Sequence, residues 1–195
     1  MTIAIDVAVL LPPQARDAVT QLNRQLEGVG GEQLRFDASH HPHVTLSQHF
    51  VRRGALATVQ TRVGRALSAQ SPFPIEVIGV GHGRTAQTLM LADTAPLRRL
   101  HAEVMDALAD LEIEDGDASA FQVDDAPARP ADVAWVAGFR AVSAYDRFAP
   151  HITVGIGGNP LTAAPFRFEA GEIAICRLGR FCACRDRLAT WILQA

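Results

Sequence analysis

Two short stretches of this chain carry the same pattern of residues that can do acid–base chemistry. The first reads Pro-His-Val-Thr-Leu at 42–46, and the second reads Pro-His-Ile-Thr-Val at 150–154. Residues two apart on a β-strand project to the same face, so each stretch would present one imidazole and one hydroxyl side by side. One copy would be weak evidence, but two copies in one chain are improbable by chance.

Two such strands facing each other across a groove would suffice to cleave a phosphodiester without a metal ion. Histidine titrates near neutral pH, so one imidazole can accept a proton while the other donates one to the leaving oxygen. The threonine hydroxyls can donate hydrogen bonds to the non-bridging phosphate oxygens. We therefore predict His43 and His151 as the acid–base pair, with Thr45 and Thr153 as phosphate donors. The sequence does not indicate which histidine is the base.

Hydrophobic periodicity predicts the elements that position these motifs. The first half reads as a strand at 3–11, a helix at 14–27, and a motif strand from 43 to about 50. Further along, the pattern predicts a helix at 56–67, strands at 74–81 and 86–92, a helix at 96–111, a loop at 112–132, a short helix at 133–143, the second motif strand, and two or three C-terminal strands.

The order of strand, helix and motif strand occurs twice, which suggests an internal duplication. We predict an α+β fold of two lobes related by an approximate twofold axis, each an antiparallel sheet with helices outside. The two His-x-Thr strands would line a central groove. The whole chain, 1–195, is expected to be one bilobal domain with lobes of about 1–85 and 86–195, and strand exchange between the lobes is allowed for.

Composition narrows the classes of partner and compartment. The net charge of −3 gives no basic field for duplex nucleic acid. All 18 basic residues are arginine, which excludes chemistry through a lysyl adduct and a phosphate loop with lysine. No apolar run is long enough to span a membrane, and Asp6 interrupts the N-terminal apolar run, which therefore reads as a strand and not as a signal peptide. We expect a cytoplasmic monomer.

The paired motifs resemble the H-x-T-x motifs of the two-histidine (2H) phosphoesterase superfamily, specifically its bacterial 2′–5′ RNA ligase-like, 2′,3′-cyclic phosphodiesterase branch. The resemblance implies a bilobal α+β fold and no cofactor. It also implies metal-independent opening or resealing of 2′,3′-cyclic phosphates, or cleavage of 2′–5′ linkages. The implied substrate is a small cyclic nucleotide, an ADP-ribose cyclic phosphate or the 2′,3′-cyclic phosphate end of an RNA.

Two other functions remain open at this point. A metal-dependent phosphodiesterase would use the histidine cluster of His40, His41 and His43, although no carboxylate lies at motif spacing. A binding module would hold a nucleotide or RNA end without turnover. We interpret His40, His41 and His49 mainly as a polar rim of the groove, since His41 and His49 share the parity of His43.

Substrate binding requires a cation for the phosphate and an apolar surface for the base. Arg147, Phe148 and Tyr145 precede the second motif and His41 precedes the first, so these four are the predicted substrate-binding residues. The wider set of candidates comprises Arg35, Arg84, Arg177, Arg180, Phe36, Phe121 and Phe181. His82 and His101 are assigned to packing or turns. Cys176, Cys182 and Cys184 lack zinc-site spacing and are interpreted as reduced strand cysteines.

Overall fold

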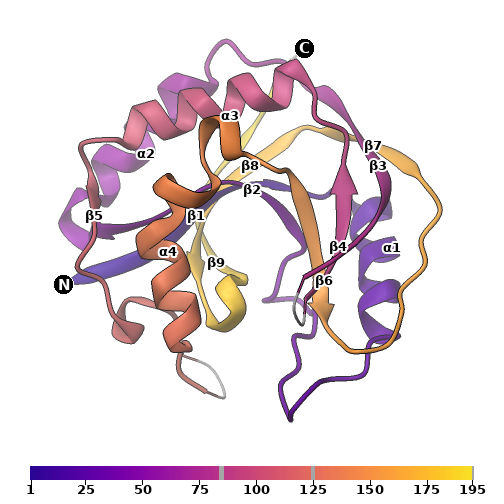
Figure 1. Cartoon of the computed structure of the whole chain (residues 1–195). Coiled ribbons are helices and arrows are strands. Elements are labelled where there is room, and N and C mark those ends of the chain that lie inside the picture. The colour runs from indigo at the N-terminus through magenta and orange to yellow at the C-terminus, as the bar shows by residue number, and fades with distance from the viewer. Residues whose placement is uncertain (84–85, 124–125, 195) are drawn as a thin grey trace.

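Residues 1–83, 86–123 and 126–194 are described in the computed structural model, and within them the chain forms two curled antiparallel sheets and four α-helices (Figure 1). The predicted α+β class is confirmed. The first sheet has the order β5-β2-β1-β8-β9. Its strands are β5 (Glu112–Ile113), β2 (His43–Arg52), β1 (Thr2–Leu10), β8 (Glu172–Leu178) and β9 (Cys184–Ile192).

The second sheet has the order β6-β4-β3-β7. Its strands are β6 (His151–Ile156), β4 (Ala86–Leu91), β3 (Phe73–His82) and β7 (Phe166–Ala170). The first sheet combines strands from both ends of the chain, whereas the second sheet is built from strands that lie between residues 73 and 170. One motif strand therefore lies in each sheet.

The helices cover the sheets on several sides (Figure 1). They are α1 (Pro13–Arg24), α2 (Leu56–Leu67), α3 (Ala95–Leu108) and α4 (Pro130–Ser143). Helices α2 and α3 pack together, α3 and α4 both pack on β2, and α1 packs on β6. None of these helices, nor any other in the described residues, is long and apolar enough to cross a membrane.

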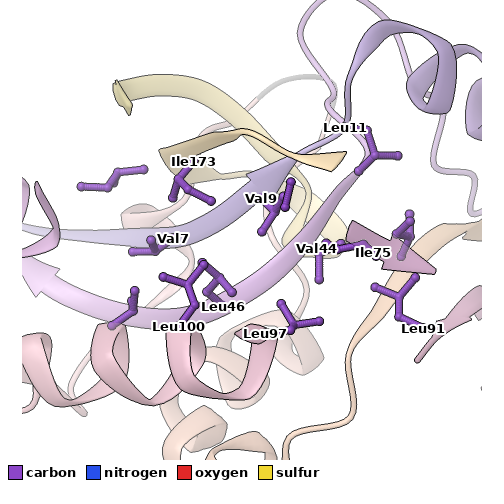
Figure 2. Close-up of a cluster of buried hydrophobic side chains, with 14 of the residues drawn as sticks. Val7, Val9, Leu11, Val44, Leu46, Ile75, Leu91, Leu97, Leu100 and Ile173 are labelled. Atoms are coloured by element: carbon purple, nitrogen blue, oxygen red, sulfur yellow. The ribbon is translucent and has the colours of Figure 1, made fainter. Parts of the chain in front are cut away.

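The main core joins both sheets to α1, α2 and α3, with both motif strands contributing to it. Val44 and Leu46 of β2 are buried beside Val7 of β1 and beside Leu97 and Leu100 of α3 (Figure 2). Each such side chain contributes about 1.5–3 kcal/mol when fully buried. The residues that alternate with the motif histidine and threonine thus anchor the strand, and the polar side chains are held on its opposite face.

Both motif strands carry a β-bulge at the same place. In the β1–β2 pairing Val7 lies opposite Ser47 and Ala8 opposite Thr45, which leaves Leu46 as the extra residue. In the β4–β6 pairing Gln87 lies opposite Gly155 and Thr88 opposite Thr153, which leaves Val154 as the extra residue. A bulge directly after each motif threonine is a local feature that the two halves share.

The segment before α4, predicted as a loop at 112–132, contributes to the core. Phe121 is buried and meets Phe50 edge to face, with ring centroids 5.8 Å apart. Helix α4 also starts earlier than predicted, at Pro130, because proline suits the first helical turn and Asp132 accepts a hydrogen bond from the backbone N–H of Arg129. Helix α1 ends at Arg24, earlier than predicted.

Candidate functional site

The four motif side chains line one pocket of about 300 Å³ between the two sheets. His43 and Thr45 come from β2, and His151 and Thr153 come from β6. Helix α4 supplies part of the wall, and the remaining wall is largely apolar. The aromatic residues lining the pocket are Phe36, Trp135, Phe139, Phe148 and Phe181.

Both histidines are held in the same way by a backbone carbonyl. Nδ1 of His43 lies 2.8 Å from the carbonyl oxygen of His41, and Nδ1 of His151 lies 2.9 Å from that of Ala149. A carbonyl can only accept, so each Nδ1 carries a proton and donates it, which leaves Nε2 for proton exchange. The proline between each histidine and its carbonyl restricts the local backbone and fixes this arrangement.

A buried carboxylate stands behind the first motif. Asp6, from the middle of β1, is fully buried. Its Oδ2 accepts hydrogen bonds from Thr45 Oγ1 at 2.8 Å and from Gln48 Nε2 at 2.7 Å. The same oxygen lies 3.4 Å from Nε2 of His43. The sequence alone did not predict that Asp6 belongs to the site. The one visible signal was a single acidic residue within an apolar strand.

Asp6 changes the electrostatics of His43. Burial by itself lowers the pKa of His43, but the hydrogen bond and charge of Asp6 outweigh it, and the net pKa is raised. The protonated imidazole is therefore favoured at His43. The hydroxyl of Thr45 is engaged by Asp6, whereas no protein partner of the Thr153 hydroxyl is found among the described residues.

The corresponding positions behind the second motif are apolar. Asp6 pairs with Gln48 across β1 and β2, three residues after Thr45. At the same register in the second sheet, Ala86 pairs with Ile156, three residues after Thr153. Both Ala86 and Ile156 line the pocket. The two histidines thus have equivalent backbones but different electrostatic surroundings.

The predicted substrate-binding residues divide between the pocket and its surroundings. Phe148 lines the pocket and stacks on His101 with ring centroids 3.9 Å apart. The other three are not among the residues that line it. The Tyr145 hydroxyl donates to Asp106, and Arg147 donates to the carbonyl of Ala141. The backbone N–H of His41 bonds to Cys184, and burial together with nearby arginines lowers the pKa of His41 to about 4.

Arg129 is the arginine that lines the pocket, and sequence reasoning did not select it. Its guanidinium lies 4.3 Å from the ring centroid of Phe181 and forms ion pairs with Asp132 and Glu32 at 2.6 and 3.0 Å. Of the wider candidates, Phe36 and Phe181 line the pocket, whereas the others lie elsewhere or have other roles. Arg35 and Arg177 donate to backbone carbonyls, Arg180 pairs with Glu32, Phe121 belongs to a separate cluster, and Arg84 lies outside the described residues.

The interpretation of His49 as part of a polar rim is wrong. The bulge at Leu46 places Gln48 on the face of Thr45, so His49 turns inward and is only 3% exposed. Its ring meets Phe139 edge to face, and burial lowers its pKa to about 3. His40 keeps an outer position with Nδ1 3.0 Å from Asp37, and His101 is a packing residue whose Nδ1 faces the carbonyl of Leu46.

Comparison with known proteins gives a family and a fold. The model of the 2′–5′ RNA ligase superfamily matches residues 11–175. No match was found among curated proteins. Among solved structures, the protein TT0787 of Thermus thermophilus is 17% identical with a TM-score of 0.65, and the match covers 98% of each chain.

Escherichia coli LigT gives similar values in complexes with two nucleotides. The complex with 3′-AMP is 17% identical and the complex with NADP⁺ 16%, each with a TM-score of 0.63 and full coverage of both chains. These likenesses show the fold. Together with the family match over most of the chain and the paired motifs in one pocket, they establish that this chain belongs to the 2′–5′ RNA ligase superfamily of two-histidine phosphoesterases.

Proposed function

We propose that this protein is a metal-independent phosphoesterase that opens 2′,3′-cyclic phosphates of small nucleotides or RNA ends. The observation that carries the proposal is the pair of motif histidines lining one pocket, His43 with Nε2 3.4 Å from the Asp6 carboxylate and His151 with Ala86 at the register of Asp6. Acid–base catalysis by two histidines requires one of them protonated and the other neutral at the same pH.

The surroundings of the two histidines support a different role for each. Because Asp6 favours the protonated form of His43, His43 is the proposed general acid, and His151 is the proposed base. In hydrolysis, Nε2 of His151 takes a proton from water as the water oxygen bonds to phosphorus. The bond from phosphorus to one ribose oxygen breaks, and His43 donates its Nε2 proton to that oxygen. The two histidines then return to their starting states by exchanging protons with solvent.

Other pocket residues would hold the substrate. The hydroxyl of Thr153 can donate to a non-bridging phosphate oxygen, while Thr45 would first have to turn from Asp6. We propose Arg129 as the cationic partner of the phosphate, and the aromatic wall as the surface for ribose and base. The solved LigT complexes with 3′-AMP, ATP and NADP⁺ support a ligand of this chemical class.

The first test is turnover of 2′,3′-cyclic nucleoside monophosphates in excess EDTA by the wild type, His43→Ala and His151→Ala. We expect chelator-resistant activity that both variants lose by at least about 100-fold. His40→Ala is the matched control, since it removes a nearby histidine that pairs with Asp37 at the protein surface. That variant should keep activity.

Each alternative gives a different result. Loss of wild-type activity in EDTA would favour a metal-dependent enzyme. No turnover by folded protein on cyclic mononucleotides, 2′–5′ dinucleotides or ADP-ribose cyclic phosphate, with nucleotide binding retained, would favour a binding module. The three free thiols suit a reducing compartment, so we propose that the protein acts in the cytoplasm.

A further inference from the structure

We propose that a thiophilic divalent cation such as Zn²⁺ binds between Asp6, His43 and Cys184 and blocks the catalytic pocket. A carboxylate oxygen, an imidazole nitrogen and the thiol sulfur of these residues all lie within 4.8 Å of one another. This site differs from the histidine cluster considered from the sequence, because its other ligands come from β1 and β9. The cation is an inhibitor and takes no part in the reaction.

The spacing of the three atoms suits a tetrahedral ion. Zinc binds nitrogen and oxygen at about 2.0–2.1 Å and sulfur at about 2.3 Å, so its ligand atoms lie roughly 3.5 Å apart. Nε2 of His43 already lies 3.4 Å from Oδ2 of Asp6, so the imidazole adjoins the carboxylate whose other oxygen, Oδ1, is the proposed ligand. Small side-chain rotations would bring the sulfur in. A carboxylate and a thiolate together would balance the charge of the ion.

A second observation points independently to a missing partner at this place. Asp6 is fully buried, yet its Oδ1 has no hydrogen-bond partner within the described part of the chain. A buried carboxylate oxygen without a partner is costly, and a bound cation would remove that cost. The hydrogen bonds that Asp6 accepts from Thr45 and Gln48 both use Oδ2, so Oδ1 can bind an ion without breaking them.

The catalytic pocket supplies the route of entry and the consequence. His43 is 12% exposed and lines the pocket, and Cys182 and Ala183 beside Cys184 also line it. A metal ion on Nε2 occupies the position of the proton that His43 would donate, so bound enzyme cannot act as an acid. This consequence rests on the proposed function, whereas binding of the ion does not.

The test is titration of the reduced, metal-free protein with Co²⁺, which reports sulfur ligation through a thiolate-to-cobalt absorption band. We expect one Co²⁺ per chain, released by Zn²⁺, and affinity weakened at least about 10- to 100-fold in Cys184→Ala. Cys182→Ala is the matched control, because its sulfur contacts the Asp132 carbonyl instead. Asp6→Asn, which preserves side-chain shape, provides a second variant with weakened binding.

Two results would overturn the proposal: no thiolate band in the folded wild type, or a band that survives in Cys184→Ala at full strength. Activity measurements add a separate criterion. Zn²⁺ should inhibit the wild type and Cys182→Ala, and Cys184→Ala should need at least about tenfold more Zn²⁺ for the same fractional inhibition. If no substrate is turned over, the cobalt titration still decides whether the ion binds.

Discussion

Replacing Asp6 with asparagine removes a negative charge from beside His43 while keeping the size of the side chain. Oδ2 of Asp6 lies 3.4 Å from Nε2 of His43, and its neighbours Thr45 and Gln48 can still donate to an amide oxygen. The hydrogen-bonded geometry can therefore survive the change. The main loss is the charge that favours the protonated imidazole.

The size of the effect follows from the distance. An opposite charge within about 4–6 Å shifts a pKa by about 1–3 units. Asp6 raises the pKa of His43 against the opposing effect of burial, so Asp6→Asn should lower that pKa. Each unit corresponds to about 1.4 kcal/mol, or a tenfold change in the protonated fraction above the pKa.

The pH–rate profile gives the assay. If His43 is the acid, activity falls on the alkaline side as His43 loses its proton, and in Asp6→Asn that limb should move to lower pH. NMR titration of the His43 ring gives the same shift without turnover. Asp37→Asn is the matched control, since it removes an exposed aspartate 3.0 Å from His40. An unchanged His43 titration in folded Asp6→Asn would refute the assignment of His43 as acid.

Three further predictions concern stability and the second motif. Asn23→Ala should lower the free energy of unfolding by about 3 kcal/mol or more in urea denaturation, because the buried Asn23 side chain satisfies two backbone carbonyls and one N–H; a loss below about 1 kcal/mol would contradict this. Because burial lowers the pKa of His49 to about 3, the unfolded chain takes up that proton below about pH 6.5 while the folded chain does not, so stability falls on acidification. His49→Gln should make that decline shallower between about pH 6.5 and 5, and an equal slope would exclude His49 as its source. Ala86→Asp places a carboxylate at the register of Asp6 behind His151. The acidic limb of the pH–rate profile should therefore move to higher pH by about one unit or more. An unchanged limb would show that position 86 is too far from His151 to act on it.

The sequence was sufficient for the class of fold and for the two motif strands. Alternation of apolar residues predicts β1 within about one residue at each end, and helical spacing predicts α2 at 56–67. The repeated His-x-Thr pattern is informative because strand geometry alone places its two polar side chains on one face. These inferences depend on local periodicity, which the observed structure preserves.

The surroundings of the motifs depend on pairing that local periodicity does not contain. Asp6 reaches His43 because β1 pairs with β2 at a register that sets position 6 opposite position 48. His49 turns inward because a bulge at Leu46 shifts the alternation of side chains by one residue. Arg129 enters the pocket because the following helix starts at Pro130, within a stretch whose composition is typical of a loop.

The two motifs differ in the residue that lies behind each histidine, and this difference has a consequence for catalysis. If two equivalent histidines had equal pKa values, the productive state, with one chosen ring protonated and the other neutral, would reach at most about a quarter of the molecules. Separating the two values by about two units in the favourable direction raises this fraction to about four fifths. The shared bulges and carbonyl contacts place both histidine rings in the same way. The residue at the equivalent register, however, is the charged Asp6 in the first sheet and the neutral Ala86 in the second. In the proposed enzyme, that difference gives two similar motifs distinct roles as acid and base.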